Sequence, residues 1–429
     1  MRISRPAGQS VPSVASCKLA IGGLEDRKMV GTRTSNLLHR ITNPLIICCL
    51  VTFGLCVHTA AALPGSGIQQ DPWRIESLAD FDVFAADPNY WSGFTRLETD
   101  VNLAGRTYTT AVIAPDTNSS GGFQGTAFTG VFDGNDHKIV WLTIDDVGAN
   151  DCLGLFGFIR EDGQVSNLGL EGVSVSGTGW FVGGLVGTNS GNVSNCYSTG
   201  SVSGVHFIGG LVGYNVGSIS NCYSTGNVSG VSFVGGLVGG NDVSSLNVGT
   251  ISNCYSTGSV SGGDYVGGLV GGNNGSVSNC YSTGDVSGDY VVGGLVGANV
   301  GLMSLFGSIS NCYSTGDVNG VDYVGGLLGH NMNIISNSFW DTDTQIHGVT
   351  ESIGLNGGIV TNVEGLHTAE MKTMSTFTDA VWDFAEIWGI GEHQTYPFLR
   401  TEPSGDSNHD GKVDLIDLAI LASHWLEEN

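Results

Sequence analysis

The residues with the clearest chemical role lie near the C-terminus, between positions 406 and 417. Oxygen-bearing side chains occupy loop positions 1, 3, 5, 9 and 12 of this segment, and Gly411 occupies position 6. Calcium takes about six to eight oxygen ligands, and this spacing lets one short loop supply most of them, with a backbone carbonyl at position 7. The sequence therefore predicts a Ca²⁺ site with these ligands: Asp406, Asn408, Asp410, Lys412 (through its carbonyl), Asp414 and Asp417. An acidic tail that binds no calcium is the alternative.

Two further groups of acidic residues could act on polysaccharides. Cleavage of a glycosidic bond by hydrolysis needs carboxylates that meet on one face. The first group repeats an Asp-Tyr pair, and the second gathers acids around a histidine: Asp264–Tyr265, Asp289–Tyr290 and Asp322–Tyr323, then Asp341, Asp343 and His347. A lyase would also need Lys or Arg, and neither occurs between Arg160 and Lys372. We therefore interpret the Asp-Tyr group as a solvated edge or a sugar-stacking rib and assign no catalytic residue; an enzyme remains the alternative.

One cysteine recurs at intervals of 26, 32, 26 and 32 residues, at Cys196, Cys222, Cys254, Cys280 and Cys312. Zinc motifs place two ligands a few residues apart within one loop, so this pattern does not predict zinc. Neighbouring cysteines one strand spacing apart could form disulfides in an oxidising compartment. Five is an odd number, however, and side chains in register point the same way. A column of buried free thiols is predicted, with disulfides as the alternative.

These residues recur because the middle of the chain repeats a unit of about 26 residues. Each copy has a Gly-Gly-Leu segment followed by a Ser-Asn pair; the segments start at Gly183, Gly209, Gly235, Gly267, Gly293 and Gly325. A helical repeat would show an apolar period of about 3.6 residues, whereas these stretches alternate over a few residues between Gly and Asn. The repeat predicts an all-β fold: a parallel β-helix of roughly seven or more coils, each with three short strands and three tight turns. A propeller or sandwich is the alternative.

The turns and the interior of such a coil can also be predicted. Gly is expected to supply positive φ at the corners, with Asn as the next most tolerant residue. Strands stacked at about 4.8 Å would bury Leu, Val and Ile in one continuous column. The identical Asn of each coil would form an internal hydrogen-bonded ladder.

The charge distribution limits the partners. The 429-residue chain has a formal net charge of −25, and no Lys or Arg occurs between Arg160 and Lys372. A nucleic-acid binder needs a basic surface to neutralise phosphates, so nucleic acid is excluded. An anionic membrane surface is disfavoured for the same reason.

The N-terminal region has the pattern of an export signal. An apolar run from Leu45 to Val57 follows Lys28, Arg33 and Arg40, and small residues at 60–62 suit cleavage before Leu63. The run is short for a membrane span, so no transmembrane anchor is predicted. We expect a secreted or cell-surface protein, with Met29 as an alternative start. A buried core helix is the other interpretation of the run.

The repeats resemble the GLUG motif family. The resemblance rests on Gly-Leu-Val-Gly at 184–187, 210–213, 236–239, 268–271 and 294–297 and on Gly-Leu-Leu-Gly at 326–329. It implies a bacterial secreted or surface β-solenoid of the kind found in adhesin-like chains and IgA-protease-type metallopeptidases. Those peptidases carry a zinc-binding His-Glu-x-x-His, which is absent from this sequence, so peptidase activity is not carried over.

The C-terminal segment resembles a dockerin type I repeat, an EF-hand-like calcium module with Asp at loop position 12. The expected helix over 415–426 has an apolar face formed by Leu418, Leu421, Ala422, Trp425 and Leu426. The resemblance implies a cohesin-like partner. A dockerin has two such loops and this sequence shows one, so pairing with another copy or with the cap of the solenoid stays open beside it.

Together these features predict five segments: a signal peptide (1–62), an N-terminal capping region (63–125), the GLUG-repeat β-helix (126–350), a C-terminal cap (351–402) and a half-dockerin calcium module (403–429). The predicted function is that of a structural and adhesive protein that binds polysaccharide or a cell-surface partner. The alternative is an extracellular hydrolase or lyase that degrades polysaccharide.

Overall fold

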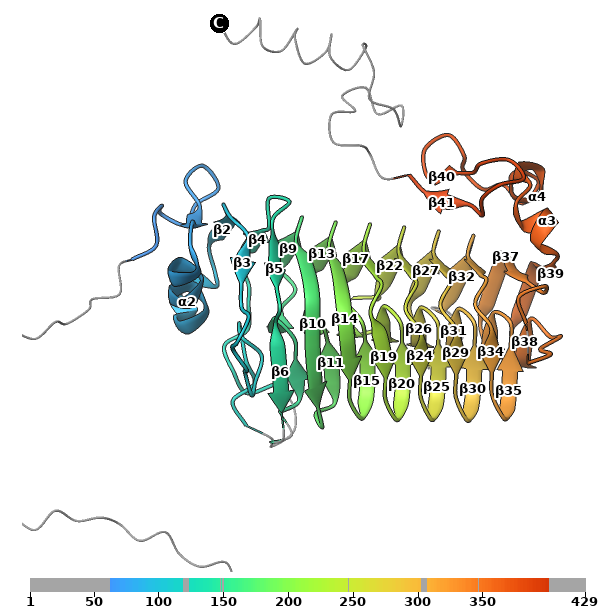
Figure 1. The fold of residues 1–429 in the computed structure, drawn as a ribbon, viewed down its shortest axis with the longest axis horizontal. Helices are drawn as coiled ribbons and strands as arrows, with labels where there is room; N and C mark the ends of the chain where they lie inside the picture. The colour runs from blue at the N-terminus through green and yellow to red at the C-terminus, as the bar shows by residue number, and fades with distance from the viewer. Residues whose placement is uncertain are drawn as a thin grey trace, which may run out of the picture. The chain divides into compact units, whose positions relative to one another are not determined.

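The computed structural model describes residues 62–118, 123–146, 148, 150–245, 247–301, 307–345 and 347–400. The calcium loop and its six predicted ligands lie outside the described residues, as does the signal peptide apart from residue 62. Within the described residues the chain winds through a stack of coils whose strands pair in parallel (Figure 1). The predicted parallel β-helix is confirmed.

Each coil contributes to three sheets. The first sheet has seven strands: β7 (Cys152–Leu153), β11 (Phe181–Gly183), β15 (His206–Gly209), β20 (Ser232–Gly235), β25 (Asp264–Gly267), β30 (Tyr290–Gly293) and β35 (Asp322–Gly325). The second has eight: β8 (Phe156–Ile159), β12 (Val186–Asn189), β16 (Val212–Asn215), β21 (Val238–Asn241), β26 (Val270–Asn273), β31 (Val296–Asn299), β36 (Leu328–Asn331) and β38 (Ile353–Asn356). These numbers match the predicted seven or more coils.

The third sheet has 24 strands in three columns. The first column is β1 (Trp73–Ile75), β2 (Phe94–Leu97), β4 (Val131–Asp133), β9 (Gln164–Ser166), β13 (Asn192–Ser194), β17 (Ser218–Ser220), β22 (Thr250–Ser252), β27 (Ser276–Ser278), β32 (Ser308–Ser310), β37 (Ile334–Asp341) and β39 (Ile359–Leu366). The second is β3 (Val101–Asn102), β5 (Lys138–Val140), β10 (Gly169–Gly177), β14 (Tyr197–Ser203), β18 (Tyr223–Ser224), β23 (Tyr255–Ser256), β28 (Tyr281–Ser282) and β33 (Tyr313–Ser314). The third is β6 (Thr143–Asp146), β19 (Asn227–Ser229), β24 (Val260–Ser261), β29 (Val286–Ser287) and β34 (Val318–Asn319), and the long strands β10 and β14 extend into it.

An inner coil therefore has five short strands rather than the predicted three. The coil from residue 206 to 229 contains β15, β16, β17, β18 and β19. The third side of the coil is divided because Asn221 takes a left-handed conformation, with φ of 54°, between β17 and β18. Its counterparts do the same in the other coils, at Asn195, Asn253, Asn279 and Asn311.

Positive φ is confirmed for the corner asparagines, and among the glycines of the coils it occurs at Gly172 and Gly200, but it is wrong for the Gly-Gly-Leu segments. None of the glycines of the Gly-Gly-Leu segments has positive φ. They are needed for close packing instead. A Cβ on Gly209 would lie 2.1 Å from the carbonyl oxygen of Val212, and one on Gly210 would lie 2.3 Å from that of Gly236 in the next coil. Both distances are far below van der Waals contact, so only glycine fits.

Identical residues stack along the interior. Val212 pairs with Val238, and Ile219 pairs with Ile251, in register and fully or almost fully buried. Six buried asparagines form the predicted ladder, in which each side-chain amide donates to the next side-chain oxygen: Asn189, Asn215, Asn241, Asn273, Asn299 and Asn331. The ladder ends at the exposed Asn356, whose side-chain oxygen accepts from Asn331. The donor–acceptor distances in this ladder are 2.8 to 3.0 Å.

The repeat cysteines are buried free thiols, as predicted. The Sγ of Cys222 donates to the carbonyl of Ser220 at 3.1 Å, and the other cysteines of the column repeat this bond. Burial raises the pKa of the Cys196, Cys222 and Cys280 thiols. The thiols therefore act as small apolar side chains in the core.

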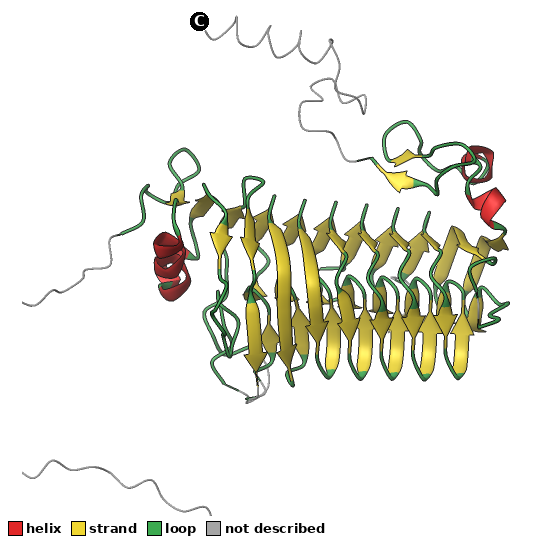
Figure 2. Cartoon of the chain, in the orientation of Figure 1, coloured by secondary structure: helices red, strands yellow, loops and turns green. Residues whose placement is uncertain are grey.

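Helices occur only toward the two ends of the described chain (Figure 2). At the N-terminal end, α2 (Leu78–Ala86) starts at Ser77, whose hydroxyl accepts from the amide of Asp80, and buries Phe81 and Phe84. The short helix η1 (Pro88–Tyr90) follows. At the C-terminal end, α3 (Thr368–Met371), α4 (Met374–Thr378) and the antiparallel pair β40 (Trp388–Gly389) and β41 (Phe398–Leu399) surround a second core that includes Trp382. No helix in the described ranges is long and apolar enough to cross a membrane.

Candidate functional site

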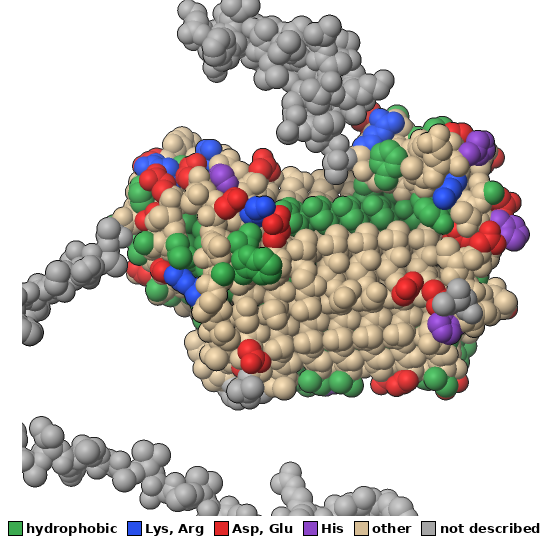
Figure 3. All heavy atoms as spheres, viewed as in Figure 1, with side chains coloured by type: hydrophobic (Ala, Val, Ile, Leu, Met, Phe, Trp, Pro, Cys, Tyr) green, Lys and Arg blue, Asp and Glu red, His purple; other side chains and the backbone are tan. Residues whose placement is uncertain are grey.

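One side of the solenoid presents a row of stacked tyrosines. The rings of Tyr197, Tyr223, Tyr255, Tyr281 and Tyr313 follow one another with centroid distances of 4.9, 4.8, 4.8 and 5.0 Å and interplanar angles of 8° or less. Figure 3 shows the row as a green band across the coils. Because each ring covers the face of its neighbour, the row presents ring edges and hydroxyl groups to solvent rather than flat ring faces.

A threonine row runs beside the tyrosines, formed by Thr199, Thr225, Thr257, Thr283 and Thr315. Two further polar rows follow: Ser201, Asn227, Ser259, Asp285 and Asp317, then Ser203, Ser229, Ser261, Ser287 and Asn319. The intervening residues, such as Val228 and Val260, are buried. We call these four rows the tyrosine–threonine face. Its only charged side chains are Asp285 and Asp317, near the C-terminal end.

The corner before each tyrosine sets this arrangement. Asn221 turns the chain with positive φ, Cys222 then points inward, and Tyr223 points outward. The backbone amide of Cys196 lies 3.4 Å from the Sγ of Cys222 and donates to it, which ties consecutive corners together. The register of the corners fixes the register of the face.

The hydroxyls at the two ends of the tyrosine row are engaged. Tyr197 donates to Glu171 at 3.0 Å, and Glu171 pairs with Lys138. Tyr313 is buried and donates to the carbonyl of Pro397 in the C-terminal cap at 2.6 Å. Between them, the hydroxyls of the partly buried Tyr223, Tyr255 and Tyr281 make no hydrogen bond to any described residue, although the ring of Tyr281 also packs against Trp388 of the C-terminal cap.

These phenols remain protonated over a wide pH range. Burial raises the pKa of Tyr255 to about 12, and burial followed by the nearby Glu171 carboxylate raises that of Tyr197 to about 12. Burial also raises the pKa of Tyr223 and Tyr281. The row is therefore neutral and able to donate hydrogen bonds.

The Asp-Tyr pairs do not form the stacked column that the sequence suggested. Asp264 pairs with Tyr290, and Tyr290 pairs with Asp322. In the coil that contains Tyr290, the Asp-Tyr pair lies one residue earlier than in the other two coils, so Asp289 is out of line with Asp264 and Asp322. Val291 takes the positive-φ position that Tyr265 and Tyr323 hold in their own coils. The three exposed aspartates thus lie along the first sheet without converging.

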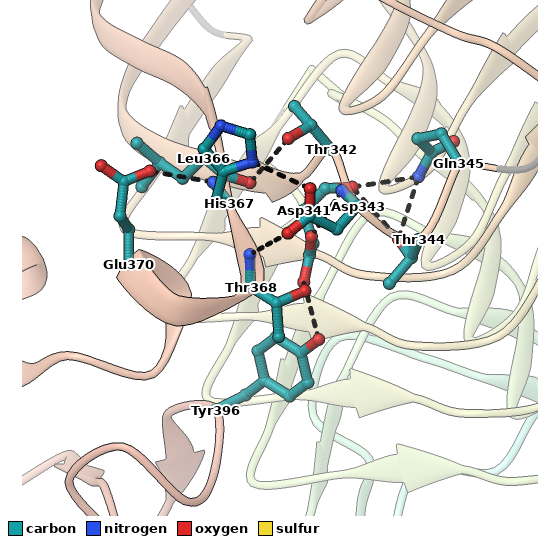
Figure 4. A network of polar contacts seen from close by, with 10 residues as sticks. All are labelled: Asp341, Thr342, Asp343, Thr344, Gln345, Leu366, His367, Thr368, Glu370 and Tyr396. Atoms are coloured by element: carbon teal, nitrogen blue, oxygen red, sulfur yellow. Dashed lines mark hydrogen bonds and ion pairs between the residues drawn. The ribbon is translucent and has the colours of Figure 1, made fainter.

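Asp341 and Asp343 of the second acidic group do lie close together, but they bind residues of the C-terminal cap (Figure 4). Asp341 is fully buried and accepts bonds from the hydroxyls of Thr368 and Tyr396, both at 2.7 Å. Asp343 accepts from the amide of Thr368 and pairs with His367 at 2.8 Å. These bonds attach the end of β37 to the C-terminal cap.

His347 does not join this group, because it pairs with Asp317 instead. His367, which the sequence analysis did not single out, pairs with Asp343 in the place expected for His347. The hydrogen bond from His367 lowers the pKa of Asp343, and the same bond raises the pKa of His367. Over the residues the structure describes, no three His, Cys, Asp or Glu side chains are grouped so that they could hold a metal ion.

The tyrosine–threonine face was the surface that sequence reasoning missed. Its signal is present in the sequence: Tyr-Ser-Thr-Gly follows the repeat cysteine in five copies, with the residues at alternate positions identical. Alternate residues of a strand point to one side, so Tyr and Thr share a face. Outward positions are free of core packing, so identical residues there are not explained by the fold alone.

Comparisons with known proteins support the repeat. A family model of the GLUG motif matches residues 179–203, 208–229, 262–287 and 288–319, which confirms the GLUG resemblance. Over 150 residues the chain is 32% identical to Halomucin from Haloquadratum walsbyi; the match covers 34% of this chain and 2% of the length of Halomucin. A crystal structure of a candidate immunoglobulin A1 protease from Bacteroides ovatus is similar at 20% identity and a TM-score of 0.48, covering 78% of this chain and 94% of that one.

Proposed function

We propose that the chain is a secreted or cell-surface repeat protein whose tyrosine–threonine face binds an extended, uncharged polysaccharide. GLUG repeats, a β-helix and the similarity to a part of Halomucin fit a structural or surface repeat protein. The observation that carries the proposal is the repetition of the same hydroxyl-bearing side chains, in register, at solvent-facing positions of consecutive coils.

The spacing of the face suits a polymer of sugar rings. Coils are separated by about 4.8 Å, which is close to the length of one pyranose in an extended chain. A polysaccharide lying along the solenoid axis would therefore meet a tyrosine hydroxyl and a threonine hydroxyl at each sugar. Each such bond contributes about 1 kcal/mol, and a polymer engages several at once.

The chemistry of the face also limits the ligand. It offers hydroxyl and amide groups, which pair with sugar hydroxyls, and its parallel ring stack leaves no free ring face for a sugar to stack on. The face has no Lys or Arg to meet carboxylate or sulfate groups, and it carries Asp285 and Asp317 at one end. A neutral glycan fits these properties better than an anionic one.

Co-sedimentation with insoluble neutral and anionic polysaccharides tests the proposal. In the test variant Tyr223, Tyr255 and Tyr281 are replaced by Phe, which keeps the ring stack and removes three hydroxyls. We expect at least a tenfold loss of affinity, from about 1 kcal/mol for each bond. The matched control replaces Tyr290 and Tyr323, on the first sheet, by Phe and should bind like the wild type. Equal binding by the test variant would exclude this face.

Turnover is measured in the same samples. Release of reducing sugar would support the alternative function, a polysaccharide-degrading enzyme, over a binding protein. The carboxylates that the sequence offered for such chemistry are dispersed along the first sheet or engaged with the cap. We therefore expect retention of polysaccharide without cleavage.

The proposal includes a calcium-binding anchoring module at residues 403–429, with the six ligands named from the sequence. Calorimetry on the chain from residue 63 to 429 should show calcium uptake that is lost in Asp410→Ala, because the fifth loop position supplies a carboxylate. Replacing Ser407, which is not a predicted ligand, by Ala is the control. No heat at millimolar calcium would contradict the anchoring module and leave the polysaccharide-binding face untouched.

A further inference from the structure

The last two coils change character at one outward column. In the inner coils this column is polar: Asn192, Ser218, Thr250, Ser276 and Ser308 pair in sequence. It then continues with Ile334 and Ile359, which are 47% and 62% exposed. This column faces away from the core, so core packing does not explain the two isoleucines at the end of the stack.

Neighbouring residues enlarge this apolar area. Met332, two residues before Ile334, is 57% exposed. Val360 pairs with the fully buried Ile335 and continues the interior column, yet it is 38% exposed because the described residues add no further coil beyond it. We call Met332, Ile334, Ile359 and Val360 the terminal patch.

The sheet edge beside the patch is also open. Among the described strands, β39 pairs with β37 alone, and β38 is the last strand of the second sheet. The other end of the solenoid is treated differently, since α2 packs against β1 and β3 and buries Phe81 and Phe84. An uncovered β edge with apolar side chains favours association, and natural proteins cover such edges with a helix or loop.

The geometry points to residues 415–426 of this same chain as the cover: we propose that this segment packs its apolar side chains on the terminal patch. The sequence gives it the helical pattern and an apolar face that includes Leu418, Leu421 and Trp425. A helix with such a face must bury it against another element.

A long connection joins the C-terminal cap to this segment. Arg400 is fixed to the C-terminal cap through bonds to the carbonyls of Trp388 and Phe384. The 14 residues from 401 to 414 can span at most roughly 50 Å. A tether of this length holds the segment at a high effective concentration, which favours it over a free partner.

Calcium would strengthen the contact, and this part rests on the proposed anchoring module. The calcium loop, 406–417, overlaps the start of the helical segment. An ion that orders the loop also orders the first turn of the helix, so calcium and capping should favour each other reciprocally. Removing calcium should loosen the cover.

Hydrogen exchange of the chain from residue 63 to 429 tests the inference. With calcium, we expect the amides of β39 to exchange at least about tenfold more slowly than in Leu421→Asp. Ser423→Asp adds the same charge to the opposite side of the helix and should leave the protection intact. Replacing Ile334 and Ile359 by Ser restores the residue type of the inner coils without breaking the fold, and it should cause the same loss as Leu421→Asp.

The outcomes separate the occupants. Protection that depends on protein concentration, together with a doubled mass in light scattering, would mean that a second copy covers the patch and would overturn the inference. Normal calcium uptake with equal β39 exchange in wild type and Leu421→Asp would overturn it while leaving the calcium proposal standing. Protection that is lost in Leu421→Asp without any calcium uptake would support the cover and contradict the anchoring module.

Discussion

The side-chain amide of Asn241 donates a 2.8 Å hydrogen bond to the side-chain oxygen of Asn273 in the next coil, although both residues are almost completely buried. Asn241 in turn accepts from Asn215. Every member of this ladder donates in the same direction along the axis. Burying an unpaired amide costs free energy. The hydrogen bonds of the ladder therefore favour one defined register between each coil and its neighbours.

Asn241→Ala should therefore lower the free energy of unfolding by about 3 kcal/mol. The change removes the donor to the oxygen of Asn273 and leaves the amide of Asn215 with only its bond to the carbonyl of Gly217, and each unsatisfied buried group costs about 1 to 3 kcal/mol. Urea unfolding followed by circular dichroism measures the difference. Asn227→Ala, on the exposed tyrosine–threonine face, is the control and should change stability by less than about 0.5 kcal/mol. Equal effects of the two changes would contradict a ladder that stabilises the stack.

The repeat glycines make a second prediction. Gly209→Ala should destabilise the fold by at least about 2 kcal/mol, because the new methyl group would overlap the carbonyl of Val212 and backbone cannot move aside cheaply. Gly357→Ala is the matched control, since the nearest atom would lie 3.9 Å from the added carbon. Thermal melting of the two variants should separate them clearly, and a Gly209→Ala protein as stable as the control would contradict the close approach of Gly209 to the carbonyl of Val212.

The cysteine column should resist chemical modification. Each thiol is buried and so out of reach of a reagent, and burial also raises the pKa of Cys196, Cys222 and Cys280, which leaves little reactive thiolate at those three positions. A thiol reagent added to the native protein is expected to leave the five repeat cysteines unlabelled, and all five should react after unfolding in guanidinium. Rapid labelling of the native protein, or failure to label the unfolded one without a reductant, would contradict buried free thiols.

The His367–Asp343 pair gives the C-terminal cap a pH dependence. The pKa of His367 is raised, so its contribution to stability is complete below the usual value of about 6.5 and is lost as the pH rises through the raised pKa. The pKa of Asp343 is lowered, so its contribution is lost as the pH falls through that lowered value. The cap should be most stable between about pH 4 and 6.5.

An NMR titration of the His367 imidazole checks this prediction. In Asp343→Asn the pKa of His367 should move back toward about 6.5, because the carboxylate that stabilises the charged ring has gone. His347→Gln, which affects the separate pair with Asp317, should leave the titration of His367 unchanged. An unshifted His367 in the wild type would contradict the pairing.

The sequence predicted those parts of the fold that the repeat determines. Cys222 and Cys254 recur within the same short sequence, Ser-Asn-Cys-Tyr-Ser-Thr-Gly, which requires equivalent positions in successive coils and so predicts the parallel register and the buried columns. The division of each coil into five strands depends on the φ angle of residues such as Asn221, which spacing alone does not determine. The role of Gly209 was mistaken because sequence shows tolerance of positive φ but not the distance to the next backbone.

The site was less predictable for a related reason. Asp264, Asp289 and Asp322 look equivalent in sequence, and a one-residue displacement within one coil removes Asp289 from the column. The partners of Asp341 come from Thr368 and Tyr396, which are far away along the chain and outside the repeat. Contacts of this kind follow from the docking of the cap, and no periodicity indicates them.

The most direct test of the proposed function is the dependence of affinity on the length of the glycan. Calorimetry with soluble oligosaccharides from a polysaccharide that the protein retains should show affinity rising with each added sugar, and levelling off near roughly three sugars, since the unengaged hydroxyls of Tyr223, Tyr255 and Tyr281 mark three coils about 4.8 Å apart. The variant with Phe at 223, 255 and 281 should lose this length dependence. Affinity that is independent of length, or that rises equally in the variant, would contradict binding along the tyrosine–threonine face.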